Sequence, residues 1–329
     1  MTSVGTEGEV RADEARTIEV ERAFVDRIYR LVALAAGSVT LIVIVLIFVF
    51  LIGRSWTAIS RVGIVDFLTT KEWQPNADSP VFGAAALLYG TVIVAVIALA
   101  IAVPLAIGAA LFINEYAPLG LRRFLTGLID LLAAVPSVIY GIWGLKFLVP
   151  EMEGTVAWIA TYLDFIPFFR PSTGAFTNSV FNAGIVVSFM VLPIITSVVR
   201  EVFSQAPRSE CEAALALGGT RWGMIRTVLL PFGRGGIVGG SMLGLGRALG
   251  ETIAVMLILI PSFEFVTRIL EPGGNTAASF IALTFQNAPP FEVRALLAVG
   301  LALFLLTLVV NMVATAIVNR SRSGQGVEL

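Results

Sequence analysis

Six long apolar stretches constrain this chain more than any other feature of its sequence. The first, residues 31–52, contains no charged side chain and is long enough to cross about 30 Å of hydrocarbon as a helix. A chain in lipid must satisfy its own backbone hydrogen bonds, so each stretch predicts a transmembrane helix. The predicted fold class is therefore an all-α polytopic membrane protein. The remaining predicted spans are residues 87–112, 125–149, 180–199, 236–260 and 295–318.

Composition supports a membrane protein and excludes several classes of site. Apolar residues make up 57% of the 329 residues, and charged residues only 14%. The chain has no histidine and one cysteine, Cys211, which excludes a histidine-based triad, a zinc site and an internal disulfide. The two lysines, Lys71 and Lys146, do not lie in a phosphate-binding loop. We therefore expect no cofactor on this chain, with ATP and Mg²⁺ bound by another subunit if ATP drives it. The net charge of −1 argues against a nucleic-acid partner.

Basic side chains in the connections predict the orientation of the spans. With both termini in the cytoplasm, that side holds 14 Lys and Arg residues and the opposite side holds 6. This excess favours cytoplasmic termini. Residues 1–30 are expected to be a cytoplasmic tail that ends in an amphipathic interfacial helix, with a solvated continuation of the first membrane helix as the alternative. Residues 320–329 are expected to be a short cytoplasmic tail. The predicted outer loops, 53–86, 150–179 and 261–294, contain tryptophans such as Trp73 that suit a headgroup belt.

Residues 204–232 predict a cytoplasmic hairpin of two short helices. Gly218 and Gly219 suit the end of an acidic, alanine-rich first helix that contains Glu212, Ala213 and Ala214. Thr220 can cap a second helix, which Pro231 is expected to end. An ordinary amphipathic surface hairpin is the alternative.

Two charged residues lie deep in the fifth predicted span. Arg247 and Glu251 each cost about 2.5–3.5 kcal/mol near the bilayer centre, so neither is expected to face lipid unpaired. As residues i and i+4 of one helix they can meet. In an ideal helix they share a stripe about 80° wide with Gly236, Gly240 and Gly244, which would let another helix approach closely. The stripe predicts a charged pathway at a subunit interface, and a permanent ion pair that only fixes packing is the alternative.

The third predicted span is interrupted by Pro136, which is followed by Ser137, Tyr140 and Gly141. Such an interruption can free backbone groups to line a cavity, which makes Ser137 and Tyr140 candidate pathway residues. A simple kink is the alternative.

Three motifs together resemble a known family. They are Ala134-Val-Pro-Ser-Val-Ile-Tyr-Gly-Ile-Trp-Gly144, the Glu-Ala-Ala hairpin, and Gly246-Arg-Ala-Leu-Gly-Glu-Thr252. The hairpin resembles the coupling loop of ABC-importer permeases, and the set resembles the PstC-type permeases of phosphate-specific ABC importers. The resemblance implies a type I ABC-importer permease fold in the bacterial cytoplasmic membrane. It also implies three partners, namely a second PstA-like permease, a PstB-like ATPase dimer and an extracytoplasmic PstS-like phosphate-binding protein.

The resemblance implies that Arg247 and Glu251 act in phosphate passage and that the chain itself is not an enzyme. It implies that Glu212, Ala213, Ala214, Gly218 and Pro231 belong to the ATPase-coupling loop. We hypothesise that Glu251 holds Arg247 when the path is empty and that phosphate displaces it. A permease for sulfate, molybdate or phosphonate remains an alternative. A phosphate-sensing membrane scaffold with a signalling role is a second one.

Overall fold

The computed structural model describes residues 24–170 and 174–322, with side chains from Asp26 to Arg170 and from Gly174 to Ala316. The predicted N-terminal tail up to residue 23 and residues 323–329 lie outside the described residues. By their internal contacts the residues form two units, Met1–Val49 and Phe50–Leu329, and each is described by itself.

The described part of the first unit is the beginning of α1 (Phe24–Val62), which continues into the second unit. Its side chains from Asp26 to Val49 are almost all exposed, and they include long runs of Leu, Ile and Val. Exposed apolar side chains on a helix of this length suit contact with lipid. The predicted interfacial helix, as far as it is described, is the first part of α1 rather than a separate element.

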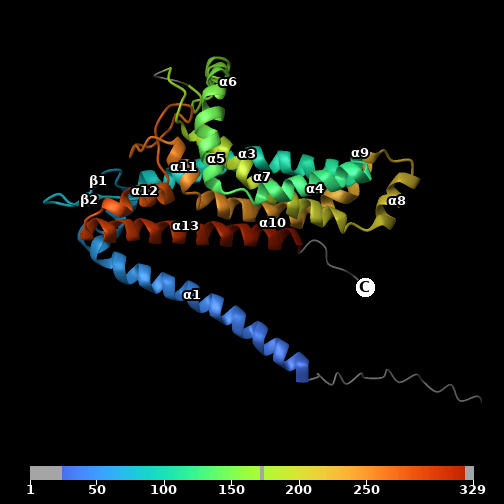
Figure 1. Ribbon diagram of the computed structural model, residues 1–329, viewed down its shortest axis with the longest axis horizontal. Helices are drawn as coiled ribbons and strands as arrows, with labels where there is room; N and C mark the ends of the chain where they lie inside the picture. Colours follow the sequence, from blue (N-terminus) through green and yellow to red (C-terminus); the bar gives the residue numbers. More distant parts are fainter. Residues whose placement is uncertain (1–23, 171–173, 323–329) are drawn as a thin grey trace, which may run out of the picture. The chain divides into compact units, whose positions relative to one another are not determined.

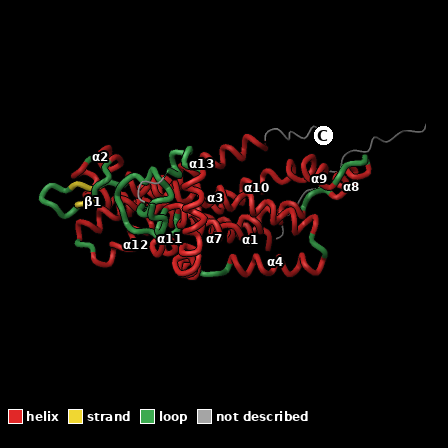
Figure 2. Tube along the Cα trace, turned by 90° about the horizontal axis from the view of Figure 1, so that it is seen from above, coloured by secondary structure: helices red, strands yellow, loops and turns green. Residues whose placement is uncertain are grey.

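The second unit is a helix bundle with a small two-stranded sheet (Figures 1 and 2). Strands β1 and β2 pair antiparallel, with Trp73 opposite Phe82. The α-helices and strands of this unit, after α1, are α2 (Ile64–Thr69), β1 (Trp73–Gln74), β2 (Val81–Phe82), α3 (Ala85–Leu111), α4 (Leu119–Ala133), α5 (Ser137–Trp143), α6 (Val149–Tyr162), α7 (Val180–Ser204), α8 (Arg208–Ala216), α9 (Arg221–Met224), α10 (Leu230–Leu249), α11 (Ile253–Ile258), α12 (Ala277–Thr284) and α13 (Pro290–Arg322).

Three π-helical turns and one 3₁₀ turn extend these helices without a break. The π-turns are Phe112–Tyr116 after α3, Gly144–Leu148 between α5 and α6, and Ile225–Leu229 between α9 and α10, and the 3₁₀ turn is Phe285–Asn287 after α12. A π-turn widens the helix by one residue and so changes the direction in which side chains point.

Among the described residues, five helical segments are long and apolar enough to span a membrane. A sixth crossing is formed if α4 and the α5–α6 helix, bent by 93° at the break between them, count as one span. We infer that they do, because α3 and α7 run in the same direction and the chain between them must return to the other end. Gly184 near the start of α7 lies against Val94 and Ile97, and Arg200 near its end contacts Asn114.

Helix α7 lies at the centre of the bundle. Within its most apolar window 72% of the residues are buried, and it packs most extensively against α3. Alanines spaced three or four residues apart on α3 are fully buried and allow the two helices to approach closely. These are Ala95, Ala98, Ala102, Ala106 and Ala110.

The third span, predicted at residues 125–149 with an interruption at Pro136, is broken into separate helices at that proline. Helix α4 ends at Ala133, and Pro136 precedes the first residue of α5. The residue before a proline is disfavoured in helical conformation, which separates the two helices. The result is a right-angle bend, and Figure 1 shows α6 projecting away from the bundle.

The end of the bundle opposite the α8–α9 hairpin is closed by an aromatic cluster. Trp73 stacks on Phe263 at 6.3 Å between ring centroids and meets Phe82 and Phe280 edge-to-face. Its Nε1 donates to Glu292 Oε1 at 2.9 Å. Trp73 is therefore part of a packed core and not a free headgroup anchor.

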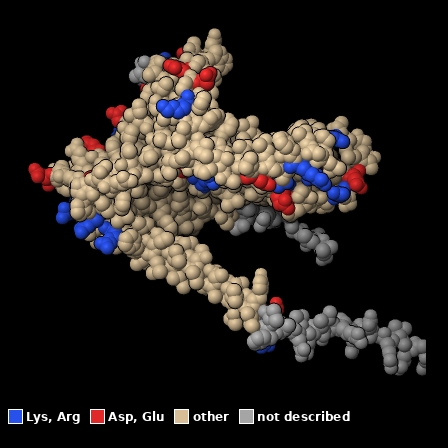
Figure 3. All heavy atoms as spheres, in the orientation of Figure 1, with Lys and Arg blue, Asp and Glu red and all other residues tan. Residues whose placement is uncertain are grey.

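Charged side chains are distributed as a membrane protein requires. In Figure 3 those of the second unit gather mostly at the two ends of the bundle and on the α6 arm. On the face drawn, the surface between the two ends is mostly uncharged.

Candidate functional site

The glycine-rich face of α10 is occupied by α7 of the same chain. A Cβ on Gly236 would lie 2.5 Å from Val202 Cγ2, and one on Gly240 would lie 3.3 Å from Val198 Cβ. At Gly244 the nearest atom is Ile195 Cδ1, at 2.7 Å from the same position. These three glycines thus hold α10 against α7, and the expected close helix contact lies within the chain rather than on a surface left free for another subunit.

The fifth span is not one continuous helix, in contrast to the expectation for residues 236–260. Helix α10 ends at Leu249, and α11 begins at Ile253. Gly250 lies at the break, and the Thr252 hydroxyl donates to its carbonyl at 3.1 Å. A broken helix at this depth exposes backbone groups, which is tolerated where protein or a water-filled cavity surrounds them.

Glu251 lies in this break and is only 7% exposed. Its Oε1 accepts a hydrogen bond from the backbone N–H of Ala254 at 3.1 Å, in the first turn of α11. A carboxylate at a helix N-terminus is stabilised by the N–H groups that have no helical partner. Because Glu251 is outside α10, it does not continue the stripe expected from an ideal helix.

Arg247 lies in the last turn of α10 and is half-buried. Its Nε is buried without a hydrogen-bond partner, and no ion pair joins it to Glu251 within the described residues. The expected pair is therefore absent, since the helix that would have placed the two residues one turn apart ends between them. Arg247 is instead close enough to Tyr140 on α5 for its charge to act on the phenol.

Helix α5, which carries Ser137 and Tyr140, packs against α11, the helix that follows this break. Gly141 permits this approach, since a Cβ there would lie only 2.8 Å from the Cα of Ala254 on α11. The Tyr140 hydroxyl donates to the carbonyl of Leu132 at 3.0 Å and so ties α5 to the end of α4 across the bend. Ser137, the first residue of α5, is half-buried. The geometry thus places an unpaired guanidinium, a tyrosine and two helix breaks near one another.

The hairpin residues lie at one end of the bundle, here called the hairpin end. Glu212 and Ala213 on α8 are exposed, while Ala214 is half-buried against the core. Gly218 has φ of +85°, a left-handed conformation that side chains with a Cβ rarely adopt, and it ends α8. Thr220 Oγ1 accepts from the N–H of Gly223 at 3.1 Å and caps α9 as expected.

Pro231 does not end the second hairpin helix, which corrects the expectation. The chain is helical from Arg221 to Leu249, and Pro231 lies in the first turn of α10 directly after the π-turn Ile225–Leu229. Proline lacks an N–H and its ring clashes with a helical carbonyl four residues earlier, so a widened turn before it accommodates the ring.

Two large apolar side chains of the hairpin are more exposed than its others. Leu217 at its tip is 90% exposed, and Trp222 on α9 is 59% exposed. Large apolar side chains at a water-facing tip are typical of a protein contact. Leu217 belongs to the first predicted hairpin helix, which was expected to contact a partner. Trp222 belongs to the second hairpin helix, for which no partner contact was predicted.

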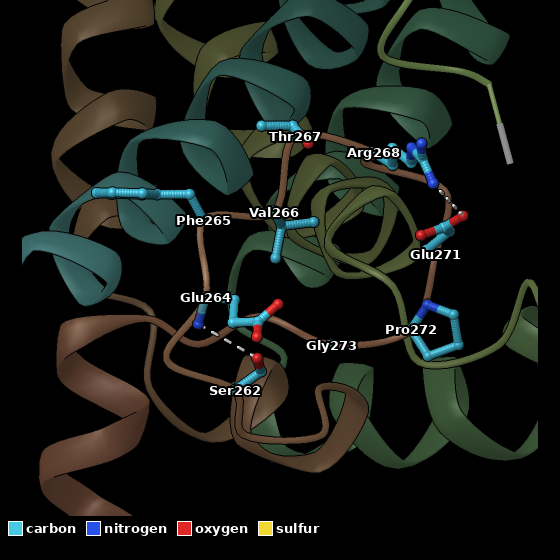
Figure 4. Close-up of a pocket in the computed structure, with 9 residues that line it drawn as sticks. All are labelled: Ser262, Glu264, Phe265, Val266, Thr267, Arg268, Glu271, Pro272 and Gly273. Atoms are coloured by element: carbon cyan, nitrogen blue, oxygen red, sulfur yellow. Dashed lines mark hydrogen bonds and ion pairs between the residues drawn. The ribbon is translucent and has the colours of Figure 1, made fainter. Parts of the chain in front are cut away.

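A separate cavity lies beyond α11, at the end opposite the hairpin. It has a volume of about 340 Å³ and is formed by residues 262–273. Figure 4 shows Arg268 and Glu271 turned toward each other, with Arg268 Nη1 at 3.7 Å from Glu271 Oε1. Arg247, Glu251, Ser137 and Tyr140 do not line this cavity, so it is distinct from the group around Arg247.

Sequence reasoning missed a polar cluster at the hairpin end. Asn114 Nδ2 donates to the carbonyl of Arg200 at 2.9 Å, and Arg122 Nη2 donates to Asn114 Oδ1 at 2.9 Å. The only sequence signal was a set of polar residues at the end of the second span, which is also what an ordinary loop contains.

Comparisons with known proteins agree with this architecture. The model of the family described as "Binding-protein-dependent transport system inner membrane component" matches residues 102–323. The chain belongs to this family. A "Phosphate transport system permease protein PstC 2" of Mycobacterium tuberculosis is 42% identical over 91% of the chain and 93% of its own length. A protein PstC of Pasteurella multocida is 35% identical over 96% of the chain and 98% of its own length.

Two solved structures of an ABC transporter share the fold. A bacterial ABC transporter that imports the acidic polysaccharide alginate superposes with a TM-score of 0.58 at 19% identity, over 90% of the chain and 98% of the solved one. The alginate transporter in complex with a periplasmic protein gives 0.56 at 21% identity, over 92% and 97%. The fold of the chain is accordingly that of an ABC-importer permease, with many membrane-spanning helices.

Proposed function

We propose that this chain is the permease subunit of an ATP-driven importer that moves inorganic phosphate across the cytoplasmic membrane by alternating access. The observation that carries the proposal is Arg247, a half-buried guanidinium with an unpaired Nε at the break of a membrane-spanning helix. A charged group inside a membrane-spanning segment raises the free energy of insertion, so such a group usually has a function. The relatives named as phosphate transport permeases supply the substrate class.

The chemistry of the site suits a phosphate that passes through. Inorganic phosphate carries one to two negative charges near neutral pH, and a guanidinium offers it a planar set of N–H donors. Tyr140 lies close by, on the helix across the break. Glu251 is also in the break, and its negative charge keeps phosphate from binding so tightly that it is trapped. In this refined scheme Glu251 tunes affinity from the start of α11 and does not hold Arg247.

Partner subunits supply the energy and the specificity. We place the hairpin end in the cytoplasm, as the excess of basic residues favours, with both termini on that side. There the exposed face of α8, from Glu212 to the tip at Leu217, docks on an ATPase dimer. A second, homologous permease completes the pathway. An extracytoplasmic phosphate-binding protein docks at the opposite end, in line with the periplasmic protein bound to the alginate transporter.

The test is transport-coupled ATP hydrolysis by the purified complex in liposomes. The binding protein is added on the side of the liposome membrane that the extracytoplasmic end of the complex faces. Phosphate, sulfate, molybdate and a phosphonate are then supplied in turn. We expect phosphate alone to stimulate hydrolysis and to be taken up. Stimulation by a different anion would overturn the substrate, and no stimulation by any anion would favour a phosphate-sensing scaffold.

The same experiment tests the role of Arg247 with the variant Arg247→Gln. It keeps a long polar side chain but removes the charge, so the complex should assemble while phosphate uptake falls by roughly 100-fold or more, as expected for the loss of a buried charged contact. Arg234→Gln is the matched control, since Arg234 is an exposed residue of the same helix. Loss of assembly in Arg247→Gln would instead assign Arg247 a packing role.

A further inference from the structure

The π-turn Phe112–Tyr116 is a joint to which three other parts of the hairpin end are attached. It continues α3 and ends at Tyr116, and Ala117 and Pro118 then lead into α4. Ile113 anchors it in the core with 2% of its surface exposed. The wider turn directs Asn114 and the carbonyl of Glu115 sideways, toward neighbouring elements.

Asn114 connects this joint to both α7 and α4. Its Nδ2 donates to the carbonyl of Arg200 on α7, and its Oδ1 accepts from Arg122 on α4, each at 2.9 Å. Arg200 Nη1 in turn donates to Thr126 on α4 at 3.3 Å. A single side chain thereby uses its donor and its acceptor on two different helices.

The hairpin is attached to the same turn through Arg221, the first residue of α9. Arg221 Nη1 donates to the carbonyl of Glu115 at 3.2 Å, and its guanidinium lies 5.9 Å from the centre of the Tyr116 ring. Movement of α9 therefore acts on the end of α3 directly, in addition to acting on α10 through the chain.

The joint also has room to rearrange. A cavity of about 250 Å³ separates the turn from the hairpin, and Asn114, Glu115, Arg122, Cys211 and Glu212 are among its lining residues. Separately, Arg200, whose carbonyl accepts from Asn114, has its Nε buried without a hydrogen-bond partner. An unpaired buried donor costs free energy, so an arrangement of the joint that supplies an acceptor is favoured once the hairpin moves.

We propose that Asn114 is a positioning residue for coupling, which makes the ends of α3, α4 and α7 move as one body when the hairpin moves. This inference rests on the proposed docking of the hairpin on an ATPase. Without Asn114 the hairpin still docks, but its movement is transmitted only to α10. The helices around Arg247 then do not shift together.

The test compares variants of the complete complex in liposomes by the amount of radioactive phosphate taken up per ATP hydrolysed. Asn114→Leu removes both hydrogen bonds at similar volume, and we expect the ratio to fall at least about fivefold, with ATP hydrolysis maintained. Asn114→Asp keeps the acceptor for Arg122 and loses the donor to Arg200, so it should give an intermediate ratio. It also keeps the test valid if the leucine variant does not fold.

Three further variants separate the possible outcomes. Arg122→Gln should lower the ratio, whereas Arg123→Gln, at the exposed neighbouring position, should leave it unchanged. Leu217→Asp at the exposed tip should release the ATPase, and retention of the ATPase in this variant would overturn the docking on which the inference rests. A wild-type ratio in both Asn114 variants, with docking intact, would overturn the role of Asn114 alone.

Discussion

The buried carboxylate of Glu251 is stabilised by a backbone N–H group rather than by a basic side chain. The carboxylate accepts the N–H of Ala254, and α11 begins directly after it. A hydrogen bond to a charged group is worth about 1.5–3 kcal/mol, which offsets part of the cost of burial. The same arrangement leaves the Arg247 guanidinium without a carboxylate partner, so an anion has no bound carboxylate to displace.

Two substitutions separate the charge of Glu251 from its hydrogen bond. Glu251→Gln keeps Oε1 as an acceptor for Ala254, so thermal stability should stay near that of the parent, while transport should saturate at a lower phosphate concentration and turn over more slowly. Glu251→Leu removes the acceptor and should destabilise the chain by about 1–3 kcal/mol. Uptake kinetics and thermal unfolding in detergent measure the two effects. Equal destabilisation by both would contradict the assigned hydrogen bond.

Cys211 on α8 should react slowly with alkylating reagents. Burial raises the pKa of its thiol above the ordinary value, and the carboxylates of Glu115, Glu210 and Glu212 raise it further. Because the thiolate is the reactive form, less of it is present at a given pH than in a free cysteine. The pH midpoint of the reaction with iodoacetamide should therefore lie above that of a cysteine peptide.

Glu212→Gln should lower the pH midpoint of this reaction, because it removes one of the negative charges near the thiol. Glu201→Gln is the control, at an exposed carboxylate on α7. A midpoint at or below that of the peptide in the parent chain would disprove the assigned environment.

At the scale of elements, the contact between α10 and α7 can be tested with two glycines of one helix. The Cβ of Gly236→Ala would lie 2.6 Å from Val202 Cβ, and valine has little rotamer freedom to move away, so we expect a cost of about 1–3 kcal/mol. Gly239→Ala has no atom within 4 Å of the new Cβ and should be neutral or slightly stabilising, since alanine favours the helix. Thermal unfolding of the two variants measures the difference. Equal stability would mean that the helices are not packed as described.

The elements also show what local sequence can and cannot predict. Apolar runs located the membrane-spanning helices because lipid demands length and hydropathy, and glycine and threonine located the end and start of the hairpin helices. The break after α10 was harder to predict, because Gly250 alone is compatible with a helix and the packing of α11 against α5 is not visible in the sequence. The prediction that Pro231 ends a helix failed for a related reason. The π-turn before it removes the clash between the proline ring and a helical carbonyl that normally ends a helix.

At the scale of the whole molecule, the connections between distant segments lay beyond the reach of the sequence. Asn114 and Arg200 are 86 positions apart, and Trp73 and Glu292 are 219 apart. No periodicity along the chain reports such pairs. The candidate residues around Arg247 could be found because a charge in an apolar stretch is conspicuous, whereas a polar side chain at a loop is not.

The central position of α7 has a consequence for how the chain is made. Spans leave the ribosome in order, and the α9–α10 segment, with a mean hydropathy of 1.3, is much less apolar than α3, at 2.8, which precedes it. Of the five continuous segments it is the least apolar, and therefore the least able to enter the bilayer unaided. Its glycine face fits a helix that has already been synthesised, so α7 is expected to serve as an intramolecular insertion partner for the segment that carries Arg247.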